Sequence, residues 1–222
     1  QVYAARVNGS QPELPALPIQ VADHAVWQRS RGAVLDGDLA WWREALDGAP
    51  SALDLPTDHM RPKVASGRGF RIPLRLGEPL AERVRRFARS VEATPFLVLL
   101  SVYQGLLSRL ANQFDVVVGS PIAGRNRREL EPLIGCFVNT LSWRADLSQN
   151  TSLVDRVAAA RRFALGAFAH AEVPFERVVE SLAAAGAIDR DSGRTPVFQA
   201  MFVLQNAPYE PLADAGITLE PL

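Results

Sequence analysis

The stretch Ile134-Gly135-Cys136-Phe137-Val138-Asn139-Thr140 decides how the sequence around it can fold. Together with the residues that follow, it predicts a strand over residues 137–144. We expect Cys136, the only cysteine of the chain, to be a buried and unreactive small hydrophobe in this apolar run. Asn139 lies among apolar residues, and a buried amide needs hydrogen-bond partners. It is therefore either a structural hydrogen-bonding group, the interpretation that we favour, or a residue that faces a substrate tunnel.

Helix and strand patterns alternate on both sides of this stretch. Alternating apolar residues between Phe70 and Leu76 predict a strand with one buried face, and apolar runs predict strands over residues 116–118 and 197–204. Helices are expected at residues 21–29, 38–46, 80–91, 96–110, 153–168 and 174–184, with Asp36 or Asp38, Thr94 and Ser152 as N-caps. The helix over residues 96–110 is apolar nearly all round and is expected at the centre. This alternation predicts an α/β two-layer sandwich with a mixed sheet.

Composition and charge argue against several classes of function. The chain has 24 Lys and Arg and 24 Asp and Glu residues, so it has no net field to recruit nucleic acid or an anionic membrane. Its longest apolar stretch, residues 96–110, is too short to span a bilayer. The three histidines lie far apart, so no metal site is expected. A single cysteine forms no internal disulfide, which suits a reducing, cytoplasmic environment.

Seven segments, in this order, resemble the second half of a condensation domain of nonribosomal peptide synthetases. They are residues 22–28 (ADHAVWQ), 39–42 (LAWW), 53–58 (LDLPTD), 134–140 (IGCFVNT), 170–176 (HAEVPFE), 190–199 (RDSGRTPVFQ) and 200–206 (AMFVLQN). The resemblance implies the C-terminal lobe of that domain, a chloramphenicol acetyltransferase-like lobe with helices packed on one face of a mixed sheet. Residues 1–18 are then a connector from a missing N-terminal lobe, and residues 207–222 are a tail leading toward a following domain.

The family places its catalytic histidine in a His-His-x-x-x-Asp-Gly motif of the first lobe. This sequence has no adjacent histidines, and the residue four places after His24, His59 and His170 is not aspartate. We therefore expect no catalytic residue in this fragment and predict that the fragment alone is inactive. The resemblance does imply an arginine here, Arg125, that pairs with the aspartate of the missing motif and supports the active site. A guanidinium is suited to that task because it binds a carboxylate through two parallel hydrogen bonds.

Other residues of the matching segments receive structural or lining roles. Arg127 and Arg128 belong to the same run as Arg125 and are interpreted as solvated. His170 is expected to cap the C-terminal end of a helix, where the helix dipole favours a cation. The remaining assignments are Pro174 at a helix start, Phe175 in the core, Asp191 and Arg194 fixing a turn, Gln199 and Gln205 as structural or tunnel-lining amides, and Trp27, Trp41 and Trp42 as packing residues.

The resemblance also implies a reaction and its partners. The intact domain would form an amide bond between a donor acyl or peptidyl thioester and an acceptor aminoacyl thioester. Each thioester is held on a carrier domain by a phosphopantetheine arm, and no cofactor is bound directly. The implied partners are the N-terminal lobe, donor and acceptor carrier domains and a downstream adenylation domain. Three alternatives stay open: a non-catalytic docking domain that recruits partner enzymes, an epimerisation domain of the same fold, and a free-standing acetyltransferase-like acyltransferase.

Overall fold

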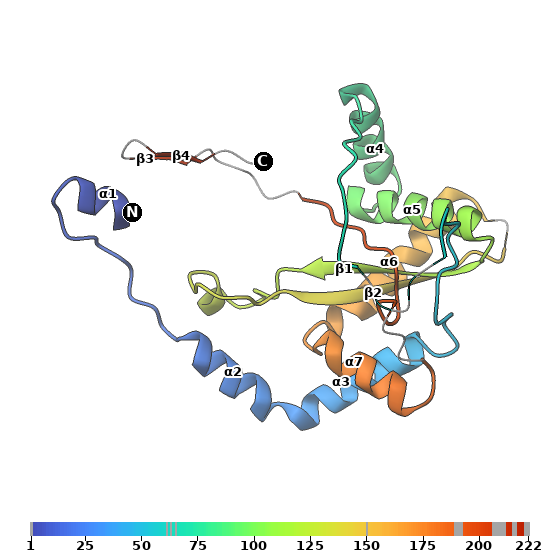
Figure 1. Ribbon diagram of the computed structural model, residues 1–222, viewed down its shortest axis with the longest axis horizontal. Coiled ribbons are helices and arrows are strands. Elements are labelled where there is room, and N and C mark those ends of the chain that lie inside the picture. The colour runs from blue at the N-terminus through green and yellow to red at the C-terminus, as the bar shows by residue number, and fades with distance from the viewer. Residues whose placement is uncertain are drawn as a thin grey trace.

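The computed structural model describes residues 2–60, 62, 64, 66–149, 151–188 and 193–205, and the backbone of two short strands near the C-terminus. Two long antiparallel strands run through its centre (Figure 1). Strand β1 (Asp115–Ile122) pairs with β2 (Asn139–Asp146) so that Gly119 lies opposite Ser142. The C-terminal strands β3 (Leu212–Asp214) and β4 (Ile217–Leu219) form a separate antiparallel pair.

A third segment makes the central sheet mixed, as the sequence predicts. The amide of Gly119 donates a hydrogen bond to the carbonyl of Ala200 at 3.0 Å, and the amide of Phe202 donates to the carbonyl of Gly119 at 2.9 Å. This contact runs parallel to β1 and is a single bridge between Gly119 and Met201. The predicted strand over residues 197–204 is therefore present only as this short pairing.

Helices lie on two sides of the central sheet, and the first helix of the chain lies apart from it (Figure 1). In the described part of the chain they are α1 (Val2–Val7), α2 (Val21–Ser30), α3 (Gly32–Ala45), α4 (Glu78–Ser90), α5 (Pro95–Ala111), the 3-10 helix η1 (Arg128–Leu130), α6 (Leu153–Ala169) and α7 (Phe175–Ala184). Helix α5 begins where predicted because the hydroxyl of Thr94 accepts a hydrogen bond from the amide of Leu97 at 3.3 Å. Helix α6 begins at a reciprocal pair of hydrogen bonds between Ser152 and Asp155.

One face of the sheet packs against α5 and α6. Trp143 of β2 is only 2% exposed, and its ring lies 5.3 Å from Phe96 of α5 and 5.7 Å from Phe168 of α6 between ring centroids. The side chain of Gln104 in α5 donates to the carbonyl of Trp143 at 2.9 Å, so the buried amide is satisfied. These contacts build the helical layer of the predicted α/β architecture.

The opposite face of the sheet is covered around Gly119. A Cβ at this glycine would lie 2.4 Å from the ring of Phe198, so only glycine lets the two segments approach. Phe198 in turn contacts Phe175 of α7 at 5.2 Å between ring centroids. Phe175 therefore packs at the edge of the core, as expected. Both faces of the sheet are buried, which explains the uninterrupted apolar run Val116-Val117-Val118 in β1.

Segment 70–76 does not form the strand that its alternating pattern predicts. Phe70, Ile72 and Leu74 are 87%, 79% and 86% exposed, and the backbone is in neither helix nor strand. A strand needs a neighbouring backbone to accept its hydrogen bonds. No described segment forms backbone hydrogen bonds with residues 70–76. The prediction is therefore wrong for this structure.

Cys136 is exposed, so the prediction that it is buried is wrong. Strand β2 begins at Asn139, two residues later than predicted, and Cys136 therefore belongs to the loop before the strand. Ile134 in the same loop is 96% exposed. The residues of this motif before Asn139 therefore form a loop, and Cys136, Phe137 and Val138 line a cavity. The sequence pattern had predicted a buried strand there.

Helix α3 also starts earlier than predicted, at Gly32, and neither Asp36 nor Asp38 caps it. Asp36 pairs with Arg177 of α7 at 2.9 Å, and Asp38 contacts the ring of His170 at 2.7 Å. The two carboxylates bind partners that are distant in sequence, which a local capping pattern does not reveal.

Helix α5 is buried on one side only. Leu100 and Leu107 are 1% and 4% exposed, whereas Val102, Leu106 and Leu110 on the outer side are 50%, 51% and 52% exposed. The prediction that this apolar helix is central therefore holds for one face only. The other face is exposed because no described element covers it. No single helix among the described residues is long and apolar enough to cross a membrane, and α4 and α5 reach that length only together, bent by 105°.

Candidate functional site

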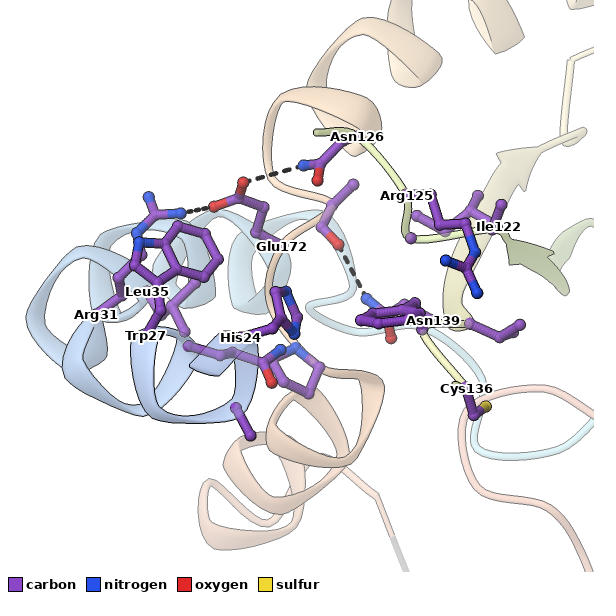
Figure 2. Close-up of a pocket in the computed structure, with 18 of the residues that line it drawn as sticks. His24, Trp27, Arg31, Leu35, Ile122, Arg125, Asn126, Cys136, Asn139 and Glu172 are labelled. Atoms are coloured by element: carbon purple, nitrogen blue, oxygen red, sulfur yellow. Dashed lines mark hydrogen bonds and ion pairs between the residues drawn. The ribbon is translucent and has the colours of Figure 1, made fainter. Parts of the chain in front are cut away.

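A cavity of about 580 Å³ lies between α2 and the loops at the ends of β1 and β2 (Figure 2). Its walls come from α2 and the start of α3, residues 122–126 at the end of β1, residues 136–139 at the start of β2, and residues around the turn between α6 and α7. Arg125 and Asn139 both line it, so the structure brings these two predicted residues together. Gln199, Gln205 and His170 do not line it.

Asn139 ties the start of β2 to the turn that follows α6. Its side-chain nitrogen donates to the carbonyls of Ala171 at 2.9 Å and Val173 at 2.7 Å. Its side-chain oxygen accepts from the amide of Phe175 at 3.0 Å, in the first turn of α7. Three segments are thus held by one amide, which is the structural role favoured from the sequence. The same residue also forms part of the cavity wall.

Arg125 is folded back onto its own loop. Its guanidinium donates to the carbonyl of Leu130 and, at 3.0 Å, to the carbonyl of Gly135. It also lies 4.4 Å from the centroid of the Phe137 ring, within the range of a cation–π contact. The preceding Gly124 has a φ of +65°, and a Cβ there would lie 1.7 Å from the carbonyl oxygen of Phe137. Only glycine therefore permits the turn that directs Arg125 into this position.

A second group of side chains at the cavity was not identified from the sequence. Glu172 accepts hydrogen bonds from Arg31 and, at 3.0 Å, from Asn126, and it lies 3.9 Å from Arg127 (Figure 2). Arg127 also lies over the ring of Trp27, 4.3 Å from its centroid. Arg127 is solvated as interpreted from the sequence, with its side chain 48% exposed, and it makes these two contacts from the surface. The sequence shows an acidic residue, Glu172, in HAEVPFE but does not indicate which basic residues it pairs with.

The other predicted residues have structural contacts. His170 is the C-cap of α6, as predicted, and its ring stacks on Trp41 with centroids 4.9 Å apart. Its carbonyl accepts from the indole of Trp42 at 2.8 Å. Gln199 accepts from the amide of Leu53 and donates to the carbonyl of Thr195 at 2.8 Å. The remaining placements are Pro174 as the N-cap of α7, Arg194 half-buried and Gln205 exposed, while Asp191 lies outside the described residues.

Arginine, amide, carboxylate and imidazole side chains line the cavity beside aromatic rings. Among its lining residues the one imidazole is His24, whose ring packs against Trp27 and Phe137 at 5.5 Å and 5.2 Å between centroids. In the part of the chain that the structure describes, no group of three or more His, Cys, Asp or Glu side chains is arranged to hold a metal ion. The chemistry that this surface offers is hydrogen bonding by arginine and amide groups, anion binding by arginine, and packing against aromatic rings.

The sequence model of the condensation domain family matches residues 1–218. Malpinin synthetase of Mortierella alpina is 40% identical over 223 residues, a match that covers 100% of this chain and 3% of that protein. Phosphinothricin tripeptide synthetase PhsB of Streptomyces viridochromogenes is 40% identical over 208 residues, which are 93% of this chain and 17% of that protein. The chain thus spans only a small part of the length of these curated relatives.

Solved structures share the fold. The X-domain from teicoplanin biosynthesis is 29% identical with a TM-score of 0.80, over 90% of this chain and 45% of that chain. The complex of that domain with OxyB gives the same sequence identity and the same TM-score, and there the match covers 44% of that chain. A four-domain nonribosomal peptide synthetase bound to AMP and glycine is 29% identical with a TM-score of 0.73, over 77% of this chain and 13% of that chain. These likenesses confirm the predicted α/β fold.

Proposed function

Because this chain belongs to the condensation domain family of nonribosomal peptide synthetases, we propose that it is the C-terminal lobe of a domain that forms amide bonds. One observation carries this proposal: the match covers 90% of this chain but 45% of a solved domain of similar fold, which fits one of two lobes. Residues 1–18 would connect to the first lobe, and residues 207–222 would lead toward an adenylation domain. A single cysteine suits the reducing cytoplasm, where we place the reaction.

In the proposed reaction the amine of an acceptor aminoacyl thioester attacks the carbonyl of a donor thioester. The new carbon–nitrogen bond replaces the carbon–sulfur bond, and the donor carrier leaves as a free phosphopantetheine thiol. The proton lost from the amine passes by way of the histidine of the first lobe to the departing sulfur, which leaves as the thiol. This chain would contribute one wall of the shared cleft and would bind no cofactor directly.

Arg125 is the residue of this lobe that we propose supports the histidine loop. Two of the five N–H groups of its guanidinium bond to the carbonyls of Leu130 and Gly135, which leaves donors for a carboxylate across the cleft. The loop that carries Arg125 is shaped by Gly124, and its guanidinium is half-buried over Phe137. A side chain held in this way loses little freedom when it pairs, which favours a bidentate contact.

The test is an assay with the intact domain, donor-loaded and acceptor-loaded carrier domains, and detection of the amide product. We expect Arg125→Ala to lower the rate by at least about tenfold, roughly the effect of one charge-assisted hydrogen bond, while Tm changes little. Arg128→Ala is the matched control, because Arg128 is exposed and its side chain has no ion pair with a described residue. Arg127 is unsuitable as a control because it contacts Trp27 and Glu172.

Two results would contradict the proposal. If Arg125→Ala retains the activity of the Arg128→Ala control, Arg125 has no role in the active site. If this chain alone forms amide product above the background without protein, the proposed dependence on a first lobe is wrong.

A non-catalytic docking domain is the second candidate, and a specific observation favours it. The X-domain from teicoplanin biosynthesis, a similar structure by TM-score, has been solved in complex with OxyB. Under this candidate the intact domain would bind a partner enzyme and form no amide bond. The carrier assay separates the two candidates, because only the condensation domain gives a product that depends on the histidine of the first lobe.

A further inference from the structure

Glu172 is the centre of a charged cluster that joins three segments distant in sequence. One carboxylate oxygen accepts from Arg31, which lies between α2 and α3. The other accepts from Asn126 at 3.0 Å and lies 3.9 Å from the guanidinium of Arg127. The side chains of Glu172 and Arg31 are 28% and 25% exposed, so water screens this contact only in part.

Trp27 completes the cluster from α2. The guanidinium carbons of Arg31 and Arg127 lie 4.9 Å and 4.3 Å from its ring centroid. Two cations at one indole repel each other, and the Glu172 carboxylate between them offsets that repulsion. Glu172 is the one carboxylate that both guanidinium groups share, so its loss would leave the two cations repelling each other at Trp27.

The backbone of Glu172 is itself fixed to the sheet. Asn139, the first residue of β2, bonds to the carbonyls on both sides of Glu172, those of Ala171 and Val173. Glu172 then holds Asn126, whose chain neighbour is Arg125. Hydrogen bonds from Asn139 to the backbone on either side of Glu172, and from Asn126 to the Glu172 side chain, thus connect the sheet to the loop that presents Arg125.

We propose that Glu172 is a positioning residue that fixes the loop over residues 122–133 against α2 and the sheet, and so sets the place of Arg125. Its consequence for amide formation rests on the proposed function. In Glu172→Gln one acceptor oxygen becomes an NH2 group, which would face either Arg31 or the pair Asn126 and Arg127, and in both cases a guanidinium, so the variant should release the loop.

Cys136 provides a probe beside the loop that does not depend on activity, because Arg125 of the loop donates a hydrogen bond to the carbonyl of Gly135, the residue before Cys136. It is exposed, is the only cysteine of this chain and lines the same cavity, so it can be alkylated with bromotrifluoroacetone. We expect Glu172→Gln to narrow the fluorine resonance of the labelled chain, because the loop moves faster. The matched control is Glu180→Gln, since Glu180 is an exposed carboxylate of α7 that makes no ion pair with any described residue. An unchanged linewidth in Glu172→Gln would overturn the proposal.

Trp27 supplies a second variant pair for the case in which Glu172→Gln is unstable. Trp27→Phe keeps an aromatic face for both arginines and should retain the wild-type linewidth. Trp27→Leu keeps an apolar side chain without that face and should narrow it. If both variants give the same linewidth as the wild type, the cluster does not hold the loop.

The catalytic consequence is measured in unlabelled intact domain. We expect Glu172→Gln to lower kcat by about tenfold, the equivalent of one charge-assisted hydrogen bond, with KM for both loaded carriers unchanged. A wild-type kcat in this variant would show that Glu172 does not position the active site. If the wild-type domain forms no product at all, the proposed function fails, while the fluorine measurement still decides the role of Glu172 in the loop.

Discussion

Arg144→Ala should be among the most destabilising single changes at a charged residue of this chain. The guanidinium of Arg144 faces Asp115 on the neighbouring strand, with 2.8 Å between its Nη2 and the carboxylate Oδ2. It also donates to the carbonyls of Ala45 at 3.2 Å and Asp47 at 2.6 Å, at the end of α3. The hydrogen bond to Asp115 raises the pKa of Arg144, so the side chain stays charged at any working pH. One residue thus joins both central strands to α3.

The magnitude follows from the geometry. Breaking a fully buried ion pair from one side costs roughly 3–5 kcal/mol, because one charge is left buried and unpaired. The side chains of Arg144 and Asp115 are 23% and 29% exposed, so water stabilises the remaining carboxylate in part. We therefore expect a loss of about 2–3 kcal/mol in the free energy of unfolding. For a chain of this length that corresponds to a Tm lowered by about 5–10 °C.

Thermal unfolding of Arg144→Ala and Arg85→Ala, measured side by side, checks this expectation. Arg85 pairs with Glu78 at 2.7 Å on α4, but the two side chains are 46% and 77% exposed. We expect its removal to change Tm by no more than about 1 °C. A double-mutant cycle of Arg144→Ala with Asp115→Ala should give a coupling of at least about 1 kcal/mol. Equal Tm values for the two arginine variants, or a coupling near zero, would refute the reasoning.

Three further predictions concern packing and exposure. Gly166→Ala should lower the free energy of unfolding by about 1–3 kcal/mol, because the added Cβ would lie 2.3 Å from the indole of Trp41. The control is Gly37→Ala in α3, where no atom lies within 4 Å of the added Cβ. In the same unfolding experiment it should be neutral or stabilising. Cys136 should react with a thiol reagent in the native chain about as fast as a thiol of a short peptide, and slow labelling would contradict its exposure. The isolated chain should self-associate through segment 70–76, where apolar side chains are exposed, and a strictly monomeric chain in concentrated solution, measured by sedimentation, would contradict this.

Local interactions are what the sequence by itself determined. The starts of α5 and α6 were predicted at Thr94 and Ser152 because a cap bonds to an amide only three residues away. Asn139 could be assigned a structural role because an amide in an apolar stretch has to be hydrogen-bonded. The family motifs likewise predicted the α/β fold. Each motif is a short contiguous segment, so it can be read from the sequence without knowing which segments meet in space.

Contacts between distant segments were decided only by the tertiary structure. Segment 70–76 has the pattern of a strand, yet a strand forms only where another backbone accepts its hydrogen bonds, and a one-dimensional pattern does not contain that partner. Asp38 has the chemistry of an N-cap but binds His170, which is 132 positions away. Glu172 reaches Arg31 across 141 positions. A sequence states which groups can donate, accept or carry charge, but the partner of each group is set by the fold that places them within a few ångströms.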